Sequence, residues 1–224
     1  ASVRLYFNLE ELAEHFRRLQ RAFRRLYVLK SLSRLTAGKH LYSAGKGWYS
    51  TLSKGFVADT TPLNKLASQL KAKFPLLPFY IWSTEEIQSA FHHVRASHVV
   101  FVHSERDALS SIMNVLSDAG YEAHWDPSKS DTERYAFRTQ APIVLRPSVS
   151  RAPVKNQFAD IEAILVDLAV ESKTLGLLDG AEFERVFKNI AKYSRIRISV
   201  LTQYAQRRKV LDFFEPLVEA VKLR

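Results

Sequence analysis

The sequence has no cysteine and lacks long apolar runs among its 224 residues. The absence of cysteine excludes disulfide bonds, thiolate metal ligands and a cysteine nucleophile. The longest apolar run, residues 74–82, holds nine residues and two prolines, whereas a membrane helix needs roughly 18 apolar residues. The first residues carry no long apolar segment behind a basic end. We therefore expect no secretory signal, no membrane contact and a cytoplasmic location.

Motifs that carry catalytic chemistry are also missing. The sequence holds no glycine-rich phosphate loop, no serine nucleophile elbow and no zinc-protease motif. Histidines gather at His92, His93, His98 and His103. However, His98 and His103 are five apart on an expected strand, which places them on opposite faces and makes them a poor metal pair. We expect no metal site, no cofactor and no catalytic residue.

The positive charge is concentrated at one end of the chain. Residues 1–56 hold eleven Lys and Arg against three Glu, a net charge of +8, while the other 168 residues hold twenty-two cations against twenty acids. A concentrated positive field attracts polyanions and displaces the counterions that surround nucleic acid. The asymmetry therefore favours nucleic acid as a partner of the first quarter.

A helical pattern dominates residues 8–37. Apolar side chains recur at spacings of three and four, and Asn8 and Gly38 suit the start and the stop of helical structure. The same spacing fits a coiled-coil seam, but it lasts fewer than three heptads. The apolar positions are Leu9, Leu12, Phe16, Leu19, Phe23 and Leu26.

A hairpin follows the helical segment. Residues 41–43 and 48–50 flank Ala44-Gly45-Lys46-Gly47, where the two glycines allow the positive φ angles of a tight turn. A basic helix followed by such a hairpin is the plan of a winged helix-turn-helix, which we expect over residues 1–58 with its turn within residues 17–25. The expected DNA contacts are Arg21, Arg24, Arg25, Lys30, Ser31, Arg34, Lys39, Lys46 and Trp48.

A second domain of mixed α and β structure is expected over residues 63–224. Turn-forming residues 51–64 separate it from the first domain. Its pattern predicts alternating strands and helices and then a helical C-terminal part, so that the fold class of the chain is α+β. Ser83 and Glu86 fit a capping box. The expected strands are 79–82, 98–103, 121–125 and 135–145, and the expected helices are 63–74, 84–92, 106–119, 161–171, 180–191, 198–209 and 213–223.

Carboxylates of the second domain leave a catalytic alternative open. Glu105, Asp160 and Asp167 could serve a nucleic-acid-processing enzyme that holds a metal ion. Glu162 and Asp167, however, are five apart on a helix and point about 140° away from each other, which favours salt bridges or capping. Near the C-terminus, Tyr204 and Arg208 have helical spacing that suits an interface as well as a solvated helix end.

The residues also resemble a known family. Residues 29–49, with their helix, short turn and Gly-Lys-Gly-Trp-Tyr wing, resemble the N-terminal winged helix of AbiEi-type antitoxins. Residues 73–84, 161–168 and 204–208 look like conserved blocks of a related bacterial family, and the order of these blocks covers most of the chain. Two departures are Ala163, where the pattern has Lys, and the Arg-rich stretch 17–25, which shows no obvious turn.

The resemblance implies an antitoxin of a type IV toxin–antitoxin system linked to abortive phage infection. Its winged helix would bind an inverted repeat in duplex DNA and repress its own operon, and its C-terminal domain would counteract a nucleotidyltransferase-like toxin, with or without a stable complex. A module that only binds a partner enzyme stays an alternative. The expected effector or partner surface comprises Glu162, Asp167, Tyr204, Arg207 and Arg208.

Overall fold

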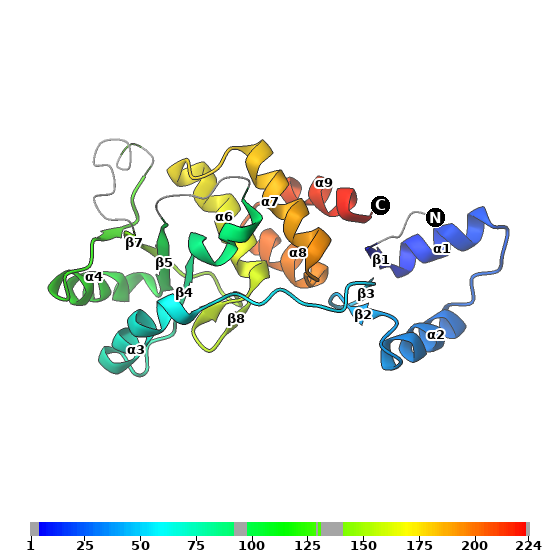
Figure 1. Ribbon diagram of the computed structural model, residues 1–224, viewed down its shortest axis with the longest axis horizontal. Helices are drawn as coiled ribbons and strands as arrows, with labels where there is room; N and C mark the ends of the chain where they lie inside the picture. The colour runs from blue at the N-terminus through cyan, green and yellow to red at the C-terminus, as the bar shows by residue number, and fades with distance from the viewer. Residues whose placement is uncertain (1–4, 92–97, 129, 131–140, 223–224) are drawn as a thin grey trace. The chain divides into compact units, whose positions relative to one another are not determined.

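The computed structural model describes residues 5–91, 98–128, 130 and 141–222. The chain divides into two compact units, which are residues 1–56 with 187–224 and residues 57–186. We call them unit 1 and unit 2. The structure is of mixed α+β class (Figure 1), as the sequence predicts.

Unit 1 begins with a strand, two helices and a hairpin. Its three strands form an antiparallel sheet of order β1-β3-β2, in which Phe7 lies opposite Tyr49. The N-terminal elements are β1 (Tyr6–Asn8), α1 (Leu9–Arg18), α2 (Arg25–Ala37), β2 (Tyr42–Ser43) and β3 (Trp48–Ser50).

The helical segment 8–37 is two helices. Residues 19–24 separate α1 from α2, and Gln20 takes a left-handed conformation with φ of 53°. Asn8 caps α1 by accepting a hydrogen bond from the Glu11 amide, as predicted. The predicted hairpin is also confirmed, with φ of 99° at Gly45 and 76° at Gly47. The two glycines supply the conformation that other residues adopt only with strain.

The C-terminal helices complete unit 1. They comprise the end of α7 (Gly180–Tyr193), α8 (Ile198–Arg207) and α9 (Leu211–Lys222). The buried Tyr6 hydroxyl donates to the Ser194 carbonyl at 2.9 Å and accepts from the Ile196 amide at 3.1 Å. The sequence pattern predicts these helices in the second domain. They group instead with residues 1–56, because strand β1 and the helices share buried contacts.

Unit 2 is built on a six-stranded mixed sheet of order β6-β7-β5-β4-β9-β8. Strands β4 and β5 are buried along their whole length, which matches their continuous apolar runs. The strands are β4 (Phe79–Ser83), β5 (Val100–Ser104), β6 (Ala123–Trp125), β7 (Ile143–Pro147), β8 (Val154–Lys155) and β9 (Phe158–Ala159). The helices are the 3-10 helices Thr61–Leu63, Thr84–Ala90 and Arg106–Ala108, with α3 (Asn64–Lys73), α4 (Leu109–Asp118), α6 (Ile161–Leu175) and the start of α7.

The two faces of this sheet differ in chemistry. On one face, Ile81, Val102 and Leu145 join an apolar core with α3 and α4. On the other face, Tyr80 and Arg146 reach polar side chains of α6. Helices α3 and α4 lie on one side of the strands and α6 on the other (Figure 1). One layer of unit 2 is therefore apolar and the other holds buried charge.

Most predicted elements of unit 2 are found with shifted ends. The Ser83–Glu86 capping box is confirmed, although the helix that it starts is of 3-10 type. Of the predicted strand 135–145, residues 135–140 lie outside the described residues, as do His92 and His93. The hairpin of β8 and β9 was not predicted, because strands of two residues leave little pattern. No helix in the described ranges is both long and apolar enough to span a membrane.

Candidate nucleic-acid interface

Helix α2 buries one stripe and exposes a basic one. Val28 and Leu32 are buried, and their spacing of four keeps them on one face. Tyr27, Lys30 and Arg34, at spacings of three and four, lie on the exposed face. Tyr27 is 71% exposed and the neighbouring Leu26 is 84% exposed. The solvent face of α2 thus combines two cations with bare apolar surface, which a merely solvated helix does not need.

The turn before α2 is held by local contacts. The Leu19 amide donates to the His15 carbonyl, and the Arg21 amide donates to the Phe16 carbonyl at 2.9 Å. The rings of Phe16 and Phe23 meet edge to face at 5.7 Å across the turn. Arg21 and Arg24 are exposed in it. The turn therefore lies within the expected residues 17–25 and presents two of the predicted contacts.

The tip of the hairpin is fixed by α8. The Lys46 amide donates to the Ser199 hydroxyl at 2.8 Å, while the Lys46 side chain is exposed. A Cβ atom on Gly45 would lie 2.1 Å from the Ser199 Oγ. Only glycine permits this close approach between the hairpin tip and α8. The contact with α8 therefore fixes the position of Lys46.

Trp48 occupies a covered position beside the hairpin. The Lys222 ammonium lies 5.0 Å from its ring centroid and 3.0 Å from a Glu11 carboxylate oxygen. Burial lowers the pKa of Lys222, but hydrogen bonds to Glu219 and Glu11 outweigh burial and raise the pKa overall. Half-buried Trp48 is thus partly engaged by α9.

A pocket of about 570 Å³ opens next to the hairpin. Its wall mixes apolar side chains with charges of both signs. Three predicted contacts line it: Arg25 from α2, and Lys46 and Trp48 from the hairpin. The lining residues are Asn8, Leu9, Glu10, Ala13, Phe23, Arg25, Lys46, Gly47 and Trp48.

The division into units sharpens the charge asymmetry. Unit 1 holds twenty Lys and Arg against six Asp and Glu, a net charge of +14. Unit 2 holds thirteen cations against seventeen acids, a net charge of −4. Residues 187–224 contribute +6 of the charge of unit 1. The whole positive excess of the protein therefore belongs to the unit that contains α2 and the hairpin.

Comparison with known families gives one assignment. Residues 27–223 match a family described as a family of unknown function, DUF6577. The chain belongs to the DUF6577 family. No curated protein matches it. The matched region begins at Tyr27, the third residue of α2, and runs through both units. In this DUF6577 protein the basic helix, the hairpin and the C-terminal helices thus fall within one family match.

Three residues of the expected effector surface are buried in this DUF6577 member. Glu162, Asp167 and Tyr204 are 2%, 0% and 0% exposed. The prediction that they form a surface was wrong, because α6 is buried on almost every side and Tyr204 faces the interior of unit 1. Arg207 and Arg208 are half-buried, with the Arg207 guanidinium 6.0 Å from the Tyr204 ring.

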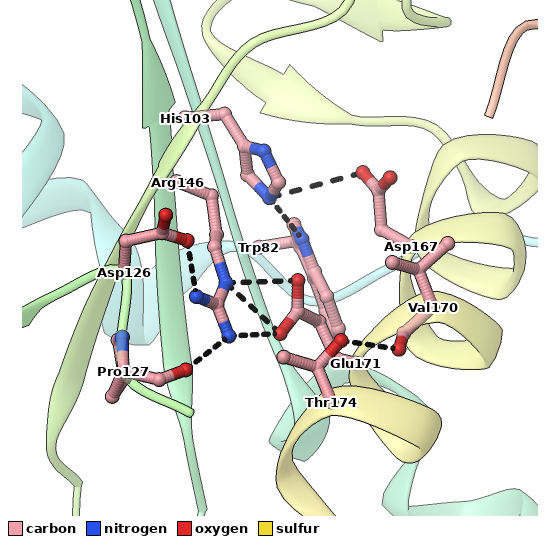
Figure 2. Close-up of polar contacts among 9 residues, drawn as sticks. All are labelled: Trp82, His103, Asp126, Pro127, Arg146, Asp167, Val170, Glu171 and Thr174. Carbon is pink, nitrogen blue, oxygen red and sulfur yellow. Dashed lines mark hydrogen bonds and ion pairs between the residues drawn. The ribbon is translucent and has the colours of Figure 1, made fainter. Parts of the chain in front are cut away.

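Asp167 belongs to a closed polar cluster between the sheet and α6 (Figure 2). The Tyr80 hydroxyl donates to Asp167 at 3.0 Å, and the His103 Nε2 atom lies 3.8 Å from the same carboxylate. The Trp82 indole donates to His103 Nε2 at 3.2 Å. That bond assigns an acceptor role to Nε2, so that a neutral His103 carries its proton on Nδ1.

A second ionic group ties β7 to the same helix. The Arg146 guanidinium makes three hydrogen bonds of 2.7 to 3.0 Å with the Glu171 carboxylate, and a fourth of 2.6 Å with Asp126 (Figure 2). The Pro127 carbonyl accepts a further bond at 3.0 Å. Buried charges need such partners. Sequence reasoning missed Arg146, because the partners lie twenty and twenty-five residues away.

The candidates for metal chemistry are dispersed or engaged. Within the described ranges, no group of three or more His, Asp or Glu side chains is placed to hold a metal ion. Glu105 is exposed after β5, and Asp160 precedes α6. Asp167 is engaged by Tyr80. The cations Lys30, Arg34 and Lys46 of unit 1, in contrast, are exposed.

Several features of the interface had weak signals in the sequence. Ser31 was predicted to contact DNA, but its hydroxyl donates to the Tyr27 carbonyl within α2. Leu26 ends the predicted apolar pattern and Tyr27 lies outside it; neither is among the predicted contacts, yet both are exposed. Ser199 lies 153 residues from Lys46, a separation that no local pattern reveals.

Proposed function

We propose that this protein is a DNA-binding regulator whose unit 1 contacts duplex DNA through helix α2 and the β2–β3 hairpin. The exposed face of α2 carries the proposal. It presents Lys30 and Arg34 together with the exposed Tyr27, next to a hairpin whose tip exposes Lys46. Arginine pairs with guanine edges in the major groove, and lysine neutralises phosphates. Bare Leu26 and Tyr27 suit apolar contacts with thymine methyl groups.

The order of elements supports a winged helix-turn-helix. Strand β1, helix α1, the turn at residues 19–24, helix α2 and the hairpin follow one another as in that motif. On this reading α2 enters the major groove and the hairpin lies over the backbone. The net charge of +14 on unit 1 supplies the long-range attraction.

A binding assay with charge-reversed variants tests this function. We expect the intact chain to bind a 30-base-pair duplex with a steep dependence on salt. We expect Arg34→Glu/Lys46→Glu to weaken binding and to lower the slope of log K against log salt by about one, because the lost phosphate contact of Lys46 removes roughly 0.9. The matched control is Lys65→Glu/Lys73→Glu, which reverses two exposed lysines of unit 2. Equal affinity and slope for the first variant and the wild type would contradict the proposal.

The biological role that we propose is that of an autorepressing antitoxin. It rests on the resemblance to AbiEi-type antitoxins, in which unit 1 would bind an inverted repeat and the protein would counteract a nucleotidyltransferase-like toxin. Expression beside a neighbouring nucleotidyltransferase-like gene should restore growth that the toxin alone inhibits. A reporter under the operon's own promoter should be repressed by the wild type and released by Arg34→Glu/Lys46→Glu. If growth is not restored and the reporter is not repressed, the antitoxin role is contradicted. DNA binding is tested separately by the binding assay.

A further inference from the structure

The end of α7 and the loop that follows it expose cations and an aromatic ring. Lys192, Tyr193 and Arg197 are exposed, and we call these three residues the α7–α8 corner. Tyr193 is 68% exposed, and the Lys192 ammonium lies 5.0 Å from its ring centroid. An exposed tyrosine among cations is typical of surfaces that bind a partner, because burial of the apolar ring against a partner is favourable.

The α7–α8 corner adjoins the hairpin within unit 1. The Arg195 guanidinium lies 4.9 Å from the ring of Tyr42 on β2. The same guanidinium donates to the Leu52 and Ser53 carbonyls at 2.7 and 2.8 Å. Two residues after Arg197, the Ser199 hydroxyl holds the Lys46 amide. These bonds fix the strands, the hairpin tip and the loop to one another.

The contact at the hairpin tip leaves little freedom for the hairpin to move relative to the α7–α8 corner. A Cβ on Gly45 would clash with Ser199 at 2.1 Å, which shows how closely the tip approaches α8. Lys46 and the α7–α8 corner are thus presented on a common, rigid support. A duplex carries one negative charge per 1.7 Å of its axis, so that a duplex lying along the hairpin offers phosphates to cations on either side of it.

We propose that the α7–α8 corner is a second contact surface for duplex DNA, which extends the interface beyond the hairpin. Lys192 and Arg197 contact backbone phosphates, and Tyr193 packs against the sugar-phosphate backbone. These contacts read no base, so that they add affinity and salt dependence on every sequence. The inference rests on the proposed function and assigns DNA-binding residues near the C-terminal end of the chain.

The test compares cations that precede α8 with one that follows it. Lys192→Gln/Arg197→Gln should weaken binding of a 30-base-pair duplex about tenfold and lower the salt slope by about two. Lys209→Gln removes an exposed charge beyond the C-terminal end of α8, roughly 18 Å from Arg197 at 1.5 Å per residue. This control should bind within twofold of the wild type. Lys192→Gln/Tyr193→Ala, also at exposed positions, repeats the test without altering the start of α8.

The outcomes separate the two proposals. Loss of affinity in both corner variants but not in Lys209→Gln supports the second surface. Wild-type affinity in the corner variants, with weakened binding by Arg34→Glu/Lys46→Glu, overturns the second surface and leaves the proposed function standing. An equal loss in Lys209→Gln also overturns it, because the effect then comes from net charge. No binding of the duplex by the wild type contradicts both proposals.

Discussion

Gly45 couples the hairpin to α8 at the scale of a single residue. Its φ of 99° favours glycine, and its Cα faces the Ser199 hydroxyl so closely that no side chain fits. Gly47 also has positive φ, but nothing lies within 4 Å of the Cβ that it would carry. A side chain at Gly47 would therefore meet only the strain of the positive φ angle. A side chain at Gly45 would meet the same kind of strain and also the close contact with Ser199.

Substitution by alanine at these two positions gives a matched pair. Gly47→Ala should destabilise the protein by about 1 kcal/mol through backbone strain alone. Gly45→Ala should cost roughly 2–4 kcal/mol, because the strain adds to the displacement of Ser199. Free energies of unfolding from denaturant titration measure the difference. Equal losses would show that the hairpin tip does not depend on its contact with α8.

Glu86 is a buried carboxyl with an altered pKa. Burial raises its pKa to about 7; the hydrogen bond from the Ser83 amide opposes this shift, and nearby Asp59 and Glu85 add to it. Because its pKa is raised in the folded state, the stability that protonated Glu86 contributes is fully present below about pH 4.5. That stability is lost as pH rises through about 7.

The pH dependence of stability checks this residue. Between pH 5 and pH 8 the wild type should lose about 2–3 kcal/mol of unfolding free energy through Glu86. Glu86→Gln, which stays neutral and retains an acceptor for the Ser83 amide, should show a flatter profile. Parallel profiles for the two proteins would rule out a raised pKa at Glu86.

Strand β7 and helix α6 are joined by buried charge at the scale of elements. Arg146 is 6% exposed at its side chain and Glu171 is 2% exposed, and their contact is bidentate. Removing one member leaves the other charged and buried, which costs more than the pair itself contributes. The contributions of Arg146 and Glu171 to stability therefore depend strongly on each other.

A double-mutant cycle tests the β7–α6 link. Arg146→Met should destabilise the protein by about 3–5 kcal/mol, because Glu171 loses its buried partner. Arg146→Met/Glu171→Met should recover a large part of that loss, and urea denaturation of the four proteins gives the coupling energy. Additive losses would contradict the assignment of Glu171 as the partner of Arg146.

The sequence predicted elements better than the contacts between them. The hairpin at residues 41–50 and the Ser83–Glu86 capping box carry local signals and were found as predicted. The break at residues 19–24 contains neither glycine nor proline, and instead Gln20 adopts a positive φ. Asp167 was assigned to a surface, because its partner Tyr80 is 87 residues away.

At the scale of the whole molecule, unit 1 is built from segments near both ends of the chain. Strand β1 is anchored by the Tyr6 hydroxyl to residues 194 and 196, and residues 52–56 bond to Arg195. Such pairings have no local periodicity, so that the sequence pattern alone places the C-terminal helices in the second domain. Unit 1 thus depends on contacts between segments that lie 188 to 190 residues apart.

This arrangement predicts that the first quarter does not fold alone. A fragment of residues 1–62 should show little tertiary structure by NMR, because the helices that bury Tyr6 are missing. In the intact chain, Tyr6→Phe should cost about 1–3 kcal/mol, since the Ser194 carbonyl and the Ile196 amide lose a shared partner. A well-dispersed spectrum for the fragment would show that residues 1–56 form an independent domain.

The central claim is that unit 1 is the DNA-binding body of this protein. Amide hydrogen exchange of the intact chain, with and without a 30-base-pair duplex, tests it most directly. We predict slower exchange in α2, in the hairpin and at the α7–α8 corner, and unchanged exchange in β5, α4 and β7 of unit 2. Slower exchange confined to unit 2, or no change in α2 at a saturating duplex concentration, would contradict the claim.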